Sequence, residues 1–386
     1  MTQHSAPPGA HPRAPGLDTL RALAIVLVFC FHYRVFVSRA PDLGWFSNVG
    51  WSGVDLFFVL SGYLIGEQLM AGLARGEQLS LAGFYARRAT RTWPLYWLVL
   101  AAFFLLPGQL GGREPPPLWR FLTFTQNIQL TPGTAFSHAW SLCVEEQFYL
   151  ALPLALLAAR ALRLSRRQAW LGIAGLTLAA IAWRHHLWTL YGSRESDVVG
   201  YYQNIYYATL GRADEFLPGL ALALLQHGHP RLWARLMRHG RLLLALGLAA
   251  VGLMWTVAVH NYVLPDDSWG WFMSAIGYSA MAWAYALLLL GCLAPGHGLS
   301  RRTLPGARSL ALWSYAVYLT HKPLAHVMKP LLQELPDWAA FGITALASVA
   351  LGGLLYHAIE RPLMRWRQRR WPNQFRPAEP VTAQPA

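Results

Sequence analysis

Charged residues are scarce in this chain of 386 residues. Asp, Glu, Lys and Arg make up only 13% of it, against about 25% in typical soluble domains. Hydrophobic residues account for 55%, and the mean hydropathy is +0.29. This composition excludes a disordered, fibrous or ordinary soluble protein and predicts a polytopic membrane protein.

Lysine and cysteine are also rare. The only lysines are Lys322 and Lys329, so nearly all of the basic residues are arginine. The three cysteines, Cys30, Cys143 and Cys292, lie inside apolar runs without CxxC spacing. The sequence therefore predicts neither a disulfide framework nor a zinc knuckle, and we expect no metal site.

Several catalytic motifs are missing. The chain has no GxxxxGK[ST], no HExxH and no GxSxG, which excludes the common phosphate-loop, zinc-protease and α/β-hydrolase sites. The HxxxxD pattern of glycerolipid acyltransferases is absent as well, because Cys143 stands where an Asp would follow His138.

Long apolar runs recur along the chain. A transmembrane helix needs about 20 largely apolar residues, and we predict an all-α, polytopic transmembrane helix bundle with about ten spans. Residues 1–16 read as a polar N-terminal segment, 17–363 as the membrane domain and 364–386 as a basic, Pro-rich tail, which we expect to be disordered. The predicted spans are 18–37, 49–69, 92–107, 139–159, 169–185, 205–226, 241–260, 270–293, 309–328 and 338–358.

The basic residues are distributed unevenly around these spans. The net charge is +14, and most of the arginines fall in the loops 66–92, 159–168, 227–241 and 294–308 and in the tail. An excess of cations marks the cytoplasmic side of a membrane, so we expect both termini in the cytoplasm. The same asymmetry explains the basic pI, and no nucleic-acid motif is present.

Ionisable side chains also lie inside the predicted spans, where each costs several kcal/mol and marks a functional site by default. Such a number of polar groups predicts a polar cavity, which suits either a membrane enzyme or a transporter. The groups are Arg21, His32, Asp55, His138, Glu145, Glu146, Arg212, Asp214, Glu215, His321 and Lys322.

Two of these groups share one helix face. Arg21 and His32 are eleven residues apart, which is about three turns and about 16 Å along a helix. Such a pair could hold the two ends of an elongated anionic ligand, or consist of a snorkelling Arg and a packed His. For Asp55 we favour a structural carboxylate paired with an Arg. The adjacent Glu145 and Glu146 point about 100° apart, so that one can face a cavity while the other pairs with a cation.

The long loop at 108–138 mixes Pro, Gly and aromatic residues. Structured loops of this length are often functional. We leave open whether it is a plain surface loop or a lid that dips toward the membrane.

Seven stretches, in order, resemble the acyltransferase-3 family of integral-membrane acyltransferases, which includes bacterial polysaccharide and lipopolysaccharide O-acetyltransferases. Together they span residues 17 to 363. They are LDTLRALAIVLVFCFHY, GVDLFFVLSGYLI, FYARRATRTWPLYW, HAWSLCVEEQFYLALPL, GRADEFLPGLALA, SYAVYLTHKPL and IERPL.

The resemblance implies roles for individual residues. His32 would be the catalytic residue and Arg21 would help to bind the acyl donor, together with a basic cluster at Arg87, Arg88 and Arg91. Glu145 would be the catalytic carboxylate, and could orient the His32 ring.

The implied reaction moves an acyl group, most simply acetyl, from acyl-CoA to a hydroxyl of a cell-surface carbohydrate or lipid-linked glycan. The implied location is the inner membrane of a bacterium. Acyl-CoA is a substrate here rather than a bound cofactor. Direct transfer and an acyl-His32 intermediate both remain open, as does a partner that completes the transfer outside the membrane.

Two positions depart from the family pattern. Glu215 adds an acid after the RxD motif, and Lys322 stands where an aromatic residue is common. An extracytoplasmic SGNH hydrolase-like domain, present in some members, is not expected here. The competing interpretation is a transporter or flippase of a polar or lipid-linked substrate. A non-catalytic sensor is disfavoured by the intact Arg21 and His32.

Overall fold

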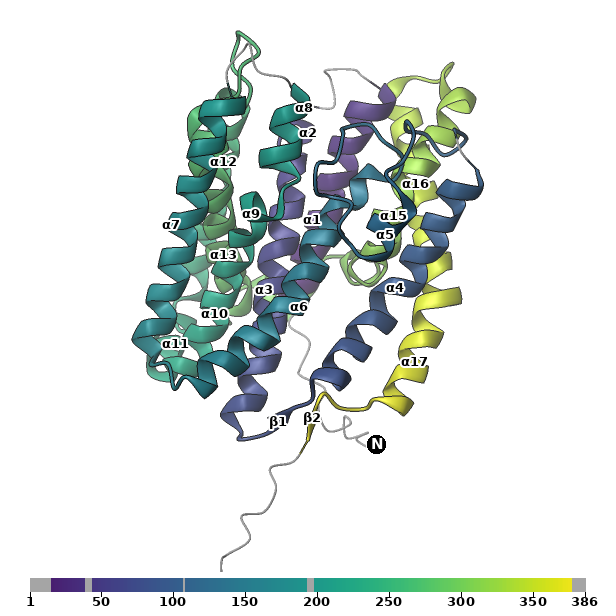
Figure 1. Ribbon diagram of the computed structural model, residues 1–386. Coiled ribbons are helices and arrows are strands. Elements are labelled where there is room, and N and C mark those ends of the chain that lie inside the picture. The colour runs from purple at the N-terminus through teal and green to yellow at the C-terminus, as the bar shows by residue number, and fades with distance from the viewer. Residues whose placement is uncertain (1–14, 39–43, 107, 193–197, 377–386) are drawn as a thin grey trace, which may run out of the picture.

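The computed structural model describes residues 15–38, 44–106, 108–192 and 198–376. Its helices stand side by side in one bundle, and a small antiparallel sheet lies at one end (Figure 1). The longer helices are α1 (Pro15–Tyr33), α3 (Gly53–Ala74), α4 (Leu81–Leu105), α6 (Trp140–Ala161), α7 (Arg166–Tyr191), α10 (Leu217–Gly228), α12 (Gly240–Asn261), α13 (Tyr278–Leu293), α15 (Ala307–Leu332), α16 (Asp337–Leu355) and α17 (Arg361–Arg370). The shorter elements are α2 (Gly44–Asn48), α5 (Leu118–Leu122), α8 (Val198–Tyr201), α9 (Thr209–Arg212), α11 (Pro230–Met237), α14 (Gly298–Arg301), β1 (Gln78–Leu79) and β2 (Phe375–Arg376).

The all-α membrane architecture is confirmed, whereas the number of spans is not. Six helical segments in the described part of the chain are long and apolar enough to cross a membrane. The remaining predicted spans correspond to α4, α7, the segment that ends in α10, and α15. The ten-span count and the sidedness of the termini therefore stay predictions. The six segments are Pro15–Ser38, Gly50–Ala74, Ser137–Ala161, Gly240–Asn261, Met273–Leu293 and Asp337–Arg370.

The predicted span 205–226 is not one continuous helix. It consists of a π-helical turn (Tyr202–Tyr206), α9, a 3-10 turn (Ala213–Phe216) and α10, with extended backbone at Ala208. Non-helical backbone inside a membrane protein persists only where other groups satisfy it. Here Asn127 donates to the Tyr207 carbonyl (3.0 Å) and Arg184 to the Gly211 carbonyl (2.7 Å).

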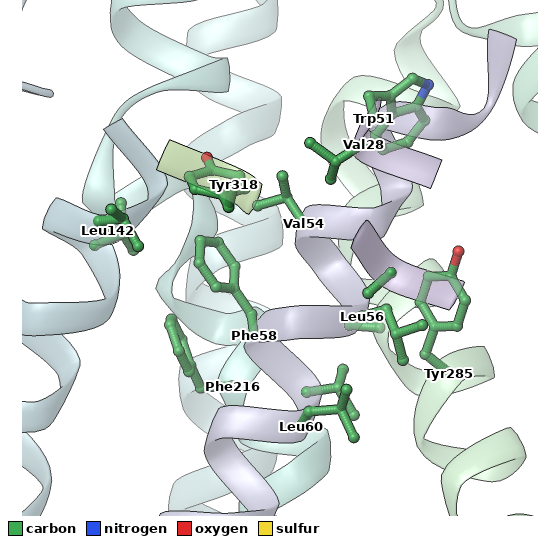
Figure 2. Packing of buried hydrophobic residues seen from close by; sticks show 14 of the residues in the cluster. Val28, Trp51, Val54, Leu56, Phe58, Leu60, Leu142, Phe216, Tyr285 and Tyr318 are labelled. Carbon is green, nitrogen blue, oxygen red and sulfur yellow. The ribbon is translucent and has the colours of Figure 1, made fainter. Parts of the chain in front are cut away.

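The core is centred on α3, which packs against α1, α10 and α13. Glycine lets α3 and α10 approach closely, because a Cβ on Gly219 of α10 would lie 2.0 Å from the Val59 carbonyl oxygen of α3. Phe58 stacks on Phe216 with 4.5 Å between ring centroids, beside Tyr318 and Val54 (Figure 2). Buried apolar packing therefore continues up to the polar groups described below.

The tail is more ordered than we predicted. A π-helical turn links α16 to α17, which packs on α4, and β2 pairs with β1 just before α4. Phe375 is buried in a hollow beside Gly72. Any side chain at position 72 would collide with the Phe375 ring, so the hollow depends on the glycine. The expectation of a disordered tail is therefore wrong for 364–376, while 377–386 and the polar segment 1–14 lie outside the described residues.

The long loop folds back into the bundle. It contains α5, and Phe121, Leu130 and Phe136 belong to the main hydrophobic core. Gln126 and Asn127 are fully buried, and the Tyr96 hydroxyl donates to Gln126 at 2.8 Å. It is therefore not a plain surface loop, and it lies toward the end of the bundle opposite the sheet (Figure 1).

Candidate active site

A pair of imidazole rings forms the centre of the candidate site. His32, in the last turn of α1, and His321, in α15, lie with Nδ1 of the first 2.7 Å from Nε2 of the second. Their rings are stacked with centroids 5.0 Å apart. A π-helical turn begins two residues after His32, an irregularity that is frequent at functional sites.

The backbone fixes the tautomers of this pair. His321 Nδ1 lies 3.0 Å and 2.9 Å from the carbonyl oxygens of Val317 and Tyr318. Since a carbonyl only accepts, Nδ1 carries the hydrogen, and Nε2 of the neutral ring is left as an acceptor. Nδ1–H of His32 then donates to it. Nε2 of His32 consequently carries a lone pair, which is what a general base requires.

His138 is a third imidazole beside the pair. It lies in the 3-10 turn Ser137–Ala139, with its ring centroid 5.8 Å from His321 and 6.3 Å from His32. His138 Nε2 donates to the Leu319 carbonyl at 3.1 Å, and its buried Nδ1 has no hydrogen-bond partner among the described residues. The described residues contain no cluster of three or more His, Cys, Asp or Glu arranged to hold a metal ion.

A second site lies around Arg21, where a cavity of about 80 Å³ is lined by Arg21, Arg88 and Arg91 and by Glu145. Glu145 accepts hydrogen bonds from the hydroxyls of Ser61 and Tyr149. The Arg88 guanidinium lies 5.3 Å from the centre of the Tyr149 ring. Three guanidiniums around one cavity make a site suited to phosphate or carboxylate oxygens.

Tyr318 contributes to both sites. Its ring lines the arginine cavity, while its carbonyl accepts from His321. Its hydroxyl donates to the His138 carbonyl at 2.5 Å and lies 2.6 Å from the Ser141 hydroxyl. Tyr318 therefore lies between the arginine cavity and the histidine pair and contacts both.

Three expectations about individual residues need correction. Glu145 does not contact His32, whose partner is His321, because Glu145 faces Ser61 and Tyr149 instead. The basic cluster lies on α4, not in a loop, since that helix begins at Leu81. Arg87 does not line the arginine cavity: it donates to the carbonyls of Trp371 (2.6 Å) and Pro372 (3.1 Å), and so holds the C-terminal segment.

Glu146 is directed away from the arginine cavity. It accepts hydrogen bonds from the Thr92 hydroxyl (2.8 Å) and the Trp93 indole (3.2 Å) on α4. The adjacent glutamates thus face different partners, as their position on a helix predicts. A cation was the expected partner of the second carboxylate, whereas its described hydrogen bonds come from neutral donors.

Asp55 is paired with an arginine. It contacts Arg212, which also pairs with Glu215 and lies 4.2 Å above the Tyr278 ring. All three charged side chains are fully buried. The extra acid at Glu215 therefore belongs to the same ion-pair cluster as Asp55, and not to the histidine site.

Arg184 is absent from the ionisable groups that the sequence places in the polar cavity, although it lies within the predicted span 169–185. The helix α7 continues to Tyr191, and Arg184 is fully buried. It binds Asp214 through two hydrogen bonds of 2.6 Å and 3.2 Å and donates to Ser279 at 2.5 Å. Its signal in the sequence was weak, because a lone Arg near a predicted helix end usually snorkels.

Comparisons with known proteins identify the family of the chain. The acyltransferase-3 family, described as "Acyltransferase domain", matches residues 15–357. The chain is 28% identical over 389 residues to YrhL of Bacillus subtilis (strain 168), covering 94% of this chain and 56% of that protein. It is 26% identical over 372 residues to the peptidoglycan O-acetyltransferase OatA of Listeria monocytogenes, covering 91% and 56%.

A third relative, the O-acetyltransferase OatA of Staphylococcus aureus (strain NCTC 8325 / PS 47), is 33% identical over 156 residues, which is 36% of this chain and 24% of that protein. The chain spans about half the length of the first two relatives. No solved structure matches it significantly. With the family match extending over most of its length, the chain belongs to the acyltransferase-3 family of membrane proteins.

Proposed function

We propose that this protein is an integral-membrane O-acyltransferase that moves an acyl group, most simply acetyl, to a hydroxyl of a carbohydrate acceptor. The observation that carries the proposal is the hydrogen bond from His32 to His321, which leaves Nε2 of His32 as a free base. Family membership supports the reaction class, and two relatives are named O-acetyltransferases.

The proposed donor is acyl-CoA, bound in the arginine cavity. Coenzyme A carries several phosphate charges at one end and a thioester at the other. Arg21, Arg88 and Arg91 offer guanidiniums to the phosphates. Arg21 and His32 lie on the same helix α1, so a ligand held at the first has its reactive end directed along that helix toward the second.

The proposed chemistry is direct transfer. Nε2 of His32 takes the proton of the acceptor hydroxyl as its oxygen attacks the thioester carbonyl. The carbon–sulfur bond then breaks, and the thiolate leaves and takes up the proton from the imidazolium. His321 stabilises that imidazolium through the hydrogen bond at Nδ1. The alternative, an acyl group held on His32 itself, would be detected as a hydroxylamine-labile label on the protein that is absent from His32→Ala.

The proposed acceptor is a cell-surface carbohydrate or a lipid-linked glycan. The name of the Listeria relative refers to peptidoglycan, which makes a cell-wall glycan the first acceptor to test. We place the protein in the inner membrane of a bacterium as a multi-pass protein. An extracytoplasmic partner that completes the transfer outside the membrane is also part of the proposal.

The test is acetyl release from radiolabelled acetyl-CoA by the purified protein in detergent, with and without a glycan mixture. We expect activity in the wild type, none in His32→Ala, and wild-type activity in His260→Ala. The control residue is an exposed histidine on α12 whose Nδ1 bonds the Thr256 carbonyl of its own helix. Retained activity in His32→Ala would refute the assignment of His32.

A polar bundle interior would also suit a transporter, and the experiment separates the two functions. Substrate flux into proteoliposomes without consumption of acetyl-CoA would favour transport. Family membership favours the enzyme, because the matched family is described as an acyltransferase domain.

A further inference from the structure

A second cavity, of about 130 Å³, opens beside the histidine pair. Its walls come from the π-helical turn that follows α1, from α4, from the long loop and from α15. We call it the Lys322 cavity; it is lined by Phe36, Phe103, Gly112, Phe136, Lys322 and His326, among others. Aromatic walls with a few polar groups are typical of small-molecule sites.

The Lys322 cavity adjoins the reacting histidine. A smaller pocket contains His32 and His321, and both spaces are lined by Phe36, Val37 and Lys322. The Phe36 ring lies 5.6 Å from the His32 ring and 3.9 Å from the Lys322 ammonium. A molecule seated in the cavity is therefore one side chain away from His32.

Lys322 brings a positive charge to this space without a matching negative one. Its described contacts are the Phe36 ring and the Ser137 hydroxyl, 3.4 Å away. Within the ranges that the structure describes, no carboxylate forms an ion pair with it. By contrast, Arg184 and Arg212 both have carboxylate partners. A partly buried ammonium without a counter-ion is costly unless a ligand supplies the charge.

The long loop holds this cavity open through its backbone. Gly112 has φ +102°, a conformation that L side chains rarely adopt, and a Cβ there would lie 2.5 Å from the Ala135 backbone. The loop pairs with itself through the bridge between Arg113 and Thr134. The wall of the cavity is thus a folded feature of the chain and not a loose surface segment.

We infer that the Lys322 cavity binds the anionic group of a negatively charged sugar, a carboxylate or a phosphate, and that Lys322 selects such acceptors over neutral ones. The aromatic side chains would contact the sugar ring while the ammonium pairs with its charge. That the bound sugar is the acyl acceptor rests on the proposed function, whereas anion binding next to His32 does not.

The test exploits the two lysines of the chain. In a Lys329→Arg variant Lys322 is the only lysine, and reductive methylation with ¹³C-formaldehyde labels it for NMR beside the separate resonance of the α-amino group. We would titrate this protein in detergent with glucuronate, glucose 6-phosphate and glucose. The matched Lys322→Arg variant reports Lys329 instead, seven residues further along α15 and outside the cavity lining.

We expect a saturable shift of the Lys322 signal with glucuronate or glucose 6-phosphate, none with glucose, and none from Lys329. Lys322→Gln should weaken binding of the anionic sugar about tenfold or more. An amine that does not react, equal shifts with glucose, or a shift caused only by phosphatidylglycerol would each overturn the inference. Saturable sugar binding by a wild-type protein that transfers no acetyl group would refute the proposed function and leave the anion site standing.

Discussion

Removing the acceptor that faces His32 should reduce catalysis without removing the catalytic residue. In His321→Leu the Nδ1–H of His32 loses its partner at 2.7 Å. A buried donor left unpaired costs about 1–3 kcal/mol, and the bond strengthens roughly twofold when His32 becomes an imidazolium in the transition state. We therefore expect roughly 2–3 kcal/mol of lost transition-state stabilisation, which is about a 30- to 160-fold fall in kcat.

The assay is single-turnover acetyl transfer at saturating donor, since the substitution does not touch the arginine cavity. His321→Gln offers an amide oxygen as acceptor and should recover part of the rate. His260→Leu repeats the substitution at an exposed helix position and should change nothing. A kcat for His321→Leu within threefold of the wild type, in a protein with an unchanged thermal midpoint, would refute the tautomer argument.

Three further predictions concern stability. Arg184→Met leaves Asp214 buried without its cation and should lower the free energy of unfolding by about 3–5 kcal/mol. Thermal unfolding followed by tryptophan fluorescence would measure this, and Arg160→Met, at an exposed position, should leave the midpoint unchanged. An unchanged midpoint for Arg184→Met would refute the pairing. Gly112→Ala should cost about 1–3 kcal/mol through backbone strain and make the long loop susceptible to protease, and a resistant loop would contradict this. Phe375→Ala should remove about 3 kcal/mol of packing and speed tryptic cleavage of the C-terminal segment, so an unaltered digestion rate would count against the docking of β2.

The helices and their apolar character could be predicted from local sequence, since span length and composition are properties of short windows. His32 could be proposed because the helix period relates it to Arg21. His321 could be placed in a polar cavity, but its pairing with His32 could not be derived. The two residues are far apart in the chain, and no local pattern records which faces of α1 and α15 meet.

The errors share one physical origin. Glu145 would lie near His32 only if its turn of α6 faced α1 at the level of His32. Its carboxylate instead contacts Ser61 on α3. Arg184 reads as a snorkelling cation at the end of the predicted span 169–185 until α7 is found to continue to Tyr191. In both cases the missing information is the relative height and rotation of packed helices, which tertiary contacts decide.

The pairing of β1 with β2 has a consequence for the order in which the protein is assembled. Phe375 contributes to the same small core as Tyr149, a residue of the arginine cavity. During translation every helix of the bundle emerges before Phe375 does, so the hollow at Gly72 stays unfilled until the last described residues are made. The wall of the proposed donor site is thus completed only after Phe375 has been synthesised, and a nascent chain cannot acquire its finished form earlier.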